Sequence, residues 1–291
     1  MRTIDQTHVI YRNPLARARR FTAEFFKYLI LAIVLVVTVA PVMLMWSSAL
    51  KTKQEINKNP IALPTSFYTD NLTKAWTVGR FSRYSLNSII ITIPTVLGVV
   101  ALSCLAGYGF ARHQFFGKRF FFMLFLVGLM VPFQSIMIPL YFNLKDFKLL
   151  GTYFAMILPA IGLGLPFGIY LMQAFFRGLP VELSDSGKVD GCNEFQVFWH
   201  IILPLTTPAI SSLAIFQFVW TWNAFLMPLI YLNKDEFRPM TLGLMFFQGR
   251  YTSDYAMISA AVTLTTLPLI LVYIILQRQF LRGLTAGAIK G

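Results

Sequence analysis

One polar stretch decides how this chain is organised: Leu179-Pro180-Val181-Glu182-Leu183-Ser184-Asp185-Ser186-Gly187-Lys188-Val189-Asp190-Gly191, followed by Ile201-Ile202-Leu203-Pro204. Four of the twelve acidic residues lie in this loop, namely Glu182, Asp185, Asp190 and Glu194. Apolar segments long enough to cross a bilayer flank the loop on both sides. We expect a membrane protein with such a loop to present it to a soluble partner.

The composition is that of a polytopic membrane protein. Hydrophobic residues make up 56% of the 291 residues and charged residues only 13%, whereas about a quarter of a soluble domain is charged. A helix needs roughly 20 apolar residues to cross about 30 Å of hydrocarbon. Six segments meet this requirement, which predicts an all-α protein with six transmembrane helices near 28–50, 87–111, 120–142, 152–176, 208–232 and 256–276.

The distribution of basic residues predicts the orientation. Six of the 25 Lys and Arg residues lie in the arm 1–27, and segments rich in Lys and Arg next to a membrane span stay in the cytoplasm. The domain prediction is therefore a cytoplasmic arm 1–27, a six-helix domain 28–282 and a cytoplasmic tail 283–291. The loop 177–204 then also lies on the cytoplasmic side of the membrane, which we expect to be a bacterial inner membrane.

Ionisable residues are missing from the centres of the six predicted spans. Transporters driven by ions or protons usually keep such groups at depth, so a self-powered carrier is not expected. The chain also lacks a phosphate-binding Gly-x-x-x-x-Gly-Lys-Ser/Thr loop. His8, His113 and His200 lie in polar segments or at a membrane edge, so neither a metal site nor an enzyme is expected.

The formal net charge of +13 has two interpretations, nucleic acid or membrane lipid. The basic residues are spread over the connecting segments rather than gathered on one face. Attraction to anionic headgroups of membrane lipids is the simpler explanation, and no nucleic acid is expected.

The polar loop has the signals of a short helix, a turn and a second helix. Pro180 suits a first helical turn and Gly191 suits a helix end. Asn193 and Gln196 have the spacing of a capping box for the second helix. Leu183, Gly187 and Gly191 are spaced by four, which predicts one shared helical face. A docking helix and an amphipathic helix lying at the bilayer surface without a partner both fit this pattern.

The loop resembles the EAA motif of ABC-importer permeases. Asp185-Ser186-Gly187 stand at the Glu-Ala-Ala positions, Gly191 stands at the motif glycine, and Ile201-Ile202-Leu203-Pro204 match the ending Ile-x-Leu-Pro. The acid is one carbon shorter and both alanines are replaced, and Gly in a helix costs about 1 kcal/mol relative to Ala.

The resemblance covers nearly the whole chain and narrows to the MalG-like carbohydrate-uptake branch. Supporting stretches are Asn87-Ser88, Gly107-Tyr108-Gly109-Phe110-Ala111-Arg112, Val131-Pro132-Phe133-Gln134, Trp222-Asn223 and the glycine-rich tail from Arg282 to Gly291. The resemblance implies the type I importer architecture with a cytoplasmic coupling helix. It implies a second homologous permease, two cytoplasmic ATPases that hold the ATP and Mg²⁺, and an extracytoplasmic sugar-binding protein. No cofactor is expected on this chain itself.

The resemblance assigns the ATPase contact to the loop helix. The residues that it marks are Glu182, Leu183, Asp185, Ser186, Gly187, Asp190 and Gly191.

The fifth predicted span carries a stripe that suits a sugar pathway. Phe216, Trp220, Asn223 and Met227 are spaced four, three and four apart, and aromatic rings suit sugar C–H faces while an amide suits hydroxyls. Gln134, between two prolines in the third span, is a further pathway candidate. Packing or lipid contact explains an aromatic stripe equally well, and a plain proline kink explains the third span.

These features predict the non-catalytic permease subunit of an ATP-driven sugar importer. Two alternatives remain at this point: a permease for a non-sugar solute such as a polyamine or phosphate ester, and a membrane scaffold that recruits a cytosolic protein without transport.

Overall fold

The computed structural model describes residues 14–248 and 254–288, with side chains from 23 to 248 and from 254 to 277. Arg2 and Arg12 of the N-terminal arm and the tail end 289–291 lie outside the described residues. The elements in order are α1 (Pro14–Ala49), α2 (Lys53–Lys58), α3 (Asp70–Thr77), α4 (Phe81–Arg112), α5 (Lys118–Gly128), α6 (Phe133–Asp146), α7 (Phe154–Arg177), α8 (Glu182–Val189), α9 (Glu194–Gln196), a π-helix (Val197–Ile202), α10 (Leu203–Leu205), α11 (Thr207–Trp222), α12 (Leu226–Tyr231), a 3₁₀ turn (Asp235–Phe237), α13 (Met240–Gly243), a second 3₁₀ turn (Leu244–Phe247) and α14 (Tyr255–Ala288).

Four helices are long and apolar enough to cross a membrane without a break. They are α4, α7, α14 and the part of α1 from Ala23 to Ala49. Two further spans are formed by bent helix pairs, α5 with α6 and Glu194–Leu205 with Thr207–Trp222, so the described residues offer up to six spans. The all-α fold with six spans is confirmed, and α14 runs without a break through residue 282, where the tail was predicted to begin.

Prolines and a turn explain where the two remaining spans bend. The axes of α5 and α6 differ by 100°, and Pro132 precedes α6 with extended backbone because it has no N–H to continue the helix. The fifth span bends by 74° around Thr206, followed by Pro208 in the first turn of α11. The prediction of one continuous fifth helix over 208–232 is wrong. Its backbone leaves the helix at Asn223 and resumes only at Leu226.

Small residues let α4 and α7 pack closely. A Cβ on Gly107 would lie 2.8 Å from the Cβ of Met172, and a Cβ on Gly168 would overlap Ser103. Membrane helices associate through such small residues because lipid gives no hydrophobic drive for burying larger ones. This helix pair is the support on which the polar loop rests.

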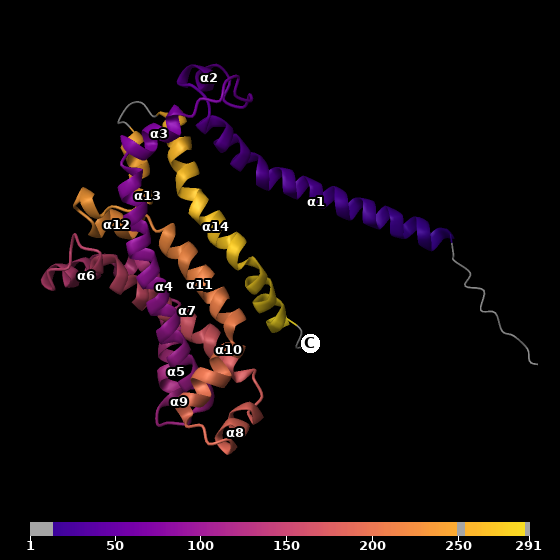
Figure 1. Ribbon diagram of the computed structural model, residues 1–291, viewed down its shortest axis with the longest axis vertical. Coiled ribbons are helices and arrows are strands. Elements are labelled where there is room, and N and C mark those ends of the chain that lie inside the picture. Colours follow the sequence, from indigo (N-terminus) through magenta and orange to yellow (C-terminus); the bar gives the residue numbers. More distant parts are fainter. Residues whose placement is uncertain (1–13, 249–253, 289–291) are drawn as a thin grey trace, which may run out of the picture.

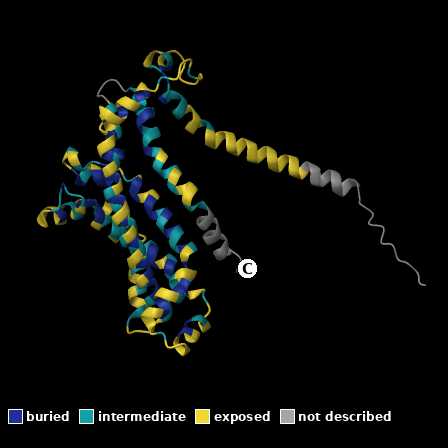
Figure 2. Ribbon diagram, in the orientation of Figure 1, coloured by how far each residue is buried: buried dark blue, intermediate teal, exposed yellow. Residues whose placement is uncertain are grey.

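The two ends of the bundle carry different connections. Figure 1 shows α8 at one end, with α2 and α3 at the other. The helix α1 leaves the bundle and packs against α14 near its own C-terminal end, and Figure 2 shows most of its described length exposed. A lipid-facing or partner-facing surface is therefore available along α1.

Candidate functional site

The polar loop folds as a short helix with a defined end. The helix α8 begins at Glu182, one residue after Val181, whose carbonyl accepts a hydrogen bond from the Asp185 amide. Gly191 has a φ of +84°, and amides after the helix bond back to the Gly187 and Lys188 carbonyls, which is the Schellman arrangement. Gly191 thus ends the helix as expected. The prediction that it shares a helical face with Leu183 is wrong, because it lies past the last turn.

Gly187 brings α8 against the π-helix. A Cβ at this position would lie 3.3 Å from Val197 Cγ2 and would overlap Ile201 Cδ1. Ser184 and Gly187 are buried, and Leu183 packs against a cluster contributed by α4, α7, the π-helix and α11. The glycine at the second alanine position of the motif therefore has a packing reason, which is close approach rather than helix propensity.

The connection after α8 is rigidly built. Asn193 accepts from the Gln196 amide while the Gln196 side chain accepts from the Asn193 amide, so the predicted capping box is present. The helix continues as a π-helix over Val197–Ile202, which sequence patterns gave no reason to expect. Its residue Ile202, from the ending of the motif, is fully buried. A movement of α8 would pass directly into this packed segment.

An ion pair joins the two parts of the loop. Lys188 Nζ lies 2.6 Å from Glu194 Oε1. The hydrogen bond to Glu194 raises the pKa of Lys188, and the hydrogen bond from Lys188 lowers the pKa of Glu194. Of the four loop acids, Glu194 is therefore used inside the loop itself.

The other three acids of the loop remain available. Glu182, Asp185 and Asp190 are exposed, and in the part of the chain described here their carboxylates form neither an ion pair nor a side-chain hydrogen bond. Ser186 and Gly191 are exposed beside them. Two apolar side chains of the loop are also exposed, Val181 (55%) and Val189 (87%). Exposed valines next to unpaired carboxylates are suited to contact with another protein.

Two residues that the sequence gave only as part of a motif fix this loop to the bundle. Arg112, at the end of α4, donates through Nη2 to the Leu179 carbonyl at 2.9 Å. Tyr108 is buried one turn earlier, with its ring 4.9 Å from Phe198 and 5.6 Å from Phe176. These partners are 67 to 90 residues distant in the sequence, so no local spacing could have identified them.

The predicted pathway residues do not form one stripe. Phe216 and Trp220 both lie against Phe167 of α7, with ring centroids 5.7 and 5.4 Å apart. Asn223 follows the end of α11 and bonds back to the Val219 carbonyl, and Met227 is buried in α12. The single helical face fails because the helix breaks between these two residues.

A cavity of about 130 Å³ lies beside this break. Trp220 and Met227 line it, together with residues of α7, whereas Phe216, Asn223 and Gln134 do not. Gln134 lies exposed in the first turn of α6. The polar side chains that line the cavity include Gln217 and Thr221, and the buried Gln217 donates to Thr221 Oγ1 at 3.1 Å. The sequence did contain a signal for this residue, because Gln217 is a polar residue in the centre of an apolar span.

The opposite end of the bundle carries a polar network that closes on itself. Asp235 accepts from Arg80 at 2.6 Å, from the Tyr84 hydroxyl at 2.7 Å and from Arg238 at 3.3 Å. Burial favours a raised pKa for Asp235, but the hydrogen bonds from Tyr84 and Arg80 outweigh it, so the pKa is lowered. The Asn87 amide donates to two carbonyls of the same turn, those of Glu236 and Arg238.

No metal centre is suggested by the residues that the structure describes, since none of them form a group of three His, Cys, Asp or Glu side chains close enough to hold an ion. The recognisable features are membrane helices, a buried π-helix and an exposed acidic helix at one end. Together they define a polytopic helical membrane protein with an exposed acidic helix at one end.

Comparison with known proteins agrees with this class. The family model described as "Binding-protein-dependent transport system inner membrane component" matches residues 100–286. The chain belongs to this family, and it is a multi-pass permease component of an ATP-binding-cassette importer.

Several relatives span almost the whole chain. A probable ABC transporter permease of Bacillus subtilis, YurM, is 33% identical over 94% of this chain and 91% of its own length. The diacetylchitobiose uptake permease NgcG of Streptomyces coelicolor is 32% identical over 94% and 90%. The arabinooligosaccharide permease AraQ of Halalkalibacterium halodurans is 32% identical over 94% and 100%.

A solved structure shares the fold. It is a bacterial ABC transporter that imports the acidic polysaccharide alginate, and one of its chains superimposes with a TM-score of 0.80 at 19% identity. The match covers 91% of this chain and 98% of the other. This similarity supports the type I importer permease architecture.

Proposed function

We propose that this permease carries an oligosaccharide delivered by an extracytoplasmic binding protein, and that cytoplasmic ATPase subunits dock on α8. A second, homologous permease completes the pathway. The single observation that carries the docking assignment is the outer face of α8, where three acids stay unpaired beside two exposed valines. Closure of the ATPase dimer would push α8, and the buried π-helix would transmit that movement to α11.

The orientation is part of this proposal. The basic N-terminal arm favours the cytoplasm, and α8 lies at the end of the bundle opposite α2 and α3 (Figure 1). The α2–α3 connection exposes apolar side chains, with Leu63 at 82% and Phe67 at 80%. We assign this surface to the binding protein, since exposed apolar clusters of this kind mark contact sites.

The substrate class rests on the relatives and on one cavity. Two of these relatives, NgcG and AraQ, are named as permeases for diacetylchitobiose and for arabinooligosaccharides. In this chain Trp220 is 54% exposed and lines the cavity with buried Gln217. An indole face and an amide beside it are suited to the C–H face and the hydroxyls of a sugar ring. We therefore place Gln217 in the pathway ahead of Asn223, because Gln217 lines the cavity and Asn223 does not.

Uptake in reconstituted vesicles tests the substrate class. The permease is assembled with its partner permease, ATPase and binding protein, and ATP-dependent accumulation of labelled arabino-, malto- and chito-oligosaccharides is compared with that of spermidine. Accumulation of an oligosaccharide supports the proposal. Accumulation of spermidine alone would assign the chain to a non-sugar permease.

Matched variants test the pathway residues. Trp220→Ala should lower the rate of uptake about tenfold by removing one aromatic contact. Asn223→Ala serves as the control, because among the described residues that side chain bonds to Val219 of its own helix and it does not line the cavity. Equal losses in both variants would remove the cavity from the pathway.

A further inference from the structure

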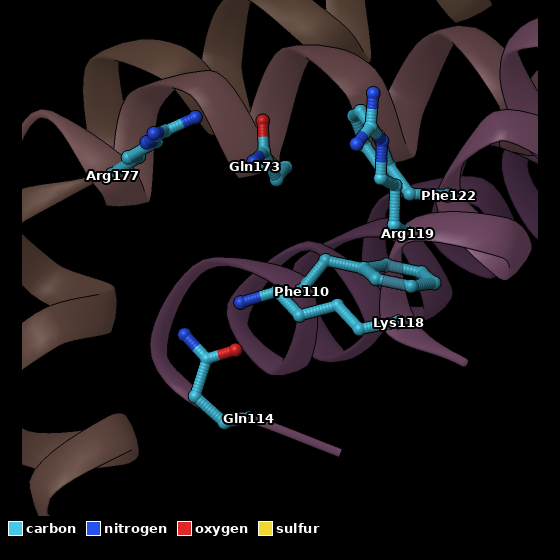
Figure 3. Close-up of a pocket in the computed structure, with 7 residues that line it drawn as sticks. All are labelled: Phe110, Gln114, Lys118, Arg119, Phe122, Gln173 and Arg177. Carbon is cyan, nitrogen blue, oxygen red and sulfur yellow. The ribbon is translucent and has the colours of Figure 1, made fainter. Parts of the chain in front are cut away.

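A second pocket of about 280 Å³ lies at the α8 end of the bundle, outside the docking and pathway residues. Three cationic side chains line it: Lys118 and Arg119 from the start of α5, and Arg177 from the end of α7. Figure 3 shows Arg177 on one side of the pocket and Lys118 on the other. No carboxylate of the described residues lines it, so its lining carries three positive charges without a compensating group.

The cations are free to bind a ligand. Lys118 Nζ donates to the His113 carbonyl at 2.8 Å, which holds it at the pocket and leaves two of its N–H donors. Arg119 and Arg177 are exposed, and neither forms an ion pair or a side-chain hydrogen bond within the described chain. Gln114 and Gln173 add amide donors to the lining.

The start of α5 adds a further positive field. Its first turn contains no acid, and Gly117 before it provides no side-chain cap. Unpaired amides and the helix dipole at such an end attract an anion. With the arginine forks, which match phosphate geometry, the chemistry of the pocket selects a phosphate group.

The surroundings indicate that the phosphate belongs to a lipid. Phe110 and Phe122 form an apolar floor, with ring centroids 5.5 Å apart. One turn further along α5, on the same side of the helix as Arg119, the surface becomes apolar, with Met123 49% exposed. A headgroup in the pocket would leave its acyl chains along this surface.

We infer that this pocket binds the headgroup of an anionic phospholipid and holds it against the ends of α5 and α7. The inference does not depend on the sugar or on ATPase docking. It assigns a function to Lys118, Arg119 and Arg177, which lie at the same end of the bundle as the polar loop.

The test uses the full-length permease in its importer complex, transferred to nanodiscs of phosphatidylcholine containing a minor fraction of phosphatidylglycerol. Retained lipid is measured by native mass spectrometry for the natural chain and for Arg119→Gln/Arg177→Gln. Removing two cations should weaken phosphatidylglycerol retention about tenfold or more. The variant Arg119→Lys/Arg177→Lys, which keeps the charge, should retain more lipid than the glutamine variant.

Matched controls distinguish a headgroup site from general charge attraction and from a soluble-anion site. Lys58→Gln/Lys145→Gln removes the same charge at exposed positions outside the pocket and should leave retention unchanged. Equal loss in this control would overturn the site, as would equal retention of phosphatidylcholine and phosphatidylglycerol. Displacement by inorganic phosphate at low millimolar concentration would assign the pocket to a soluble anion and overturn the lipid assignment.

Discussion

The two ends of the bundle use their acidic residues in opposite ways. At one end Asp235 accepts hydrogen bonds from Arg80, Tyr84 and Arg238, and it ties a loop to the start of α4. At the other end Glu182, Asp185 and Asp190 bind nothing in the described chain, while packing and a carbonyl contact from Arg112 hold their loop. The charge of Asp235 is structural at the first end, whereas at the second end only Glu194 of the four loop acids forms an ion pair within the described residues.

This contrast indicates which loop waits for a partner. A folded chain gains from pairing its exposed acids only modestly, so leaving three of them unpaired on one short helix costs little stability. It does provide a surface that a basic or dipolar partner can recognise. Four variants would break or sharpen the comparison.

The largest effect is expected from Gly187→Leu. The new side chain would overlap Ile201 and press on Val197, and overpacking of a tight contact costs about 1–3 kcal/mol. The melting temperature of the permease should fall, and the rate of ATP hydrolysis stimulated by the binding protein should fall with it. Gly187→Ala is the matched control, since the flexible end of Ile201 can rotate away from one methyl group. Full activity of Gly187→Leu would show that α8 does not need its contact with the π-helix.

Asp185→Lys should act on the partner and leave the permease fold unchanged. The side chain is exposed and unpaired, so the melting temperature should stay within error, while stimulated ATP hydrolysis should drop about tenfold through charge reversal at the contact. Co-purification of the ATPase provides a second readout. Normal coupling in this variant would remove the carboxylate from the docking surface.

Asp235→Asn should show the reverse behaviour. Loss of the charge weakens three hydrogen bonds at a partly exposed position, which corresponds to about 1 kcal/mol of stability. The pKa of Asp235 is lowered in the folded protein, so its contribution is present above the ordinary value of 3.8 and is lost as the pH falls through the folded value. The melting temperatures of the natural chain and of Asp235→Asn should therefore become equal in acid. A selective loss of ATPase coupling would contradict the structural role.

Glu194→Gln should have the smallest effect. The pKa of Glu194 is lowered and that of Lys188 is raised, so the pair contributes between the ordinary values of 4.5 and 10.5 and fades on either side. Amide hydrogen exchange in α8 at neutral pH should increase slightly in the variant. An unfolded α8 would show that the ion pair, rather than Gly187, holds the helix in place.

Long apolar runs and local caps were readable from the sequence. The spans that became α1, α4, α7 and α14 follow hydropathy, and the capping box at Asn193 needs residues only three apart. The breaks within the third and fifth spans were harder to predict from the sequence. Proline at 132 signalled a disturbance but not a 100° bend, and Pro228 signalled a break in the fifth span but not that α11 ends at Trp222.

The position of α8 was predictable from the sequence, but the contacts that hold it were not. The motif spacing located α8, yet Arg112, Tyr108 and the Asp235 network depend on partners 67 to 155 residues away. Gly187 illustrates the difference, because as a helix residue it is unfavourable and only its contact with Ile201 explains it.

Site-directed cross-linking tests the docking face of α8 most directly. Single cysteines replace Val189, which is 87% exposed in α8, and Glu236, at the opposite end, in a chain whose Cys104 and Cys192 are changed to serine. Each assembled importer is labelled at its cysteine with maleimide–benzophenone and irradiated, so that the benzophenone inserts into a C–H bond of whichever chain lies beside it. We expect the ATPase subunit to be joined to the Val189→Cys chain and not to the Glu236→Cys chain. Cross-linking of the ATPase at position 236 and not at 189 would contradict force transmission through α8.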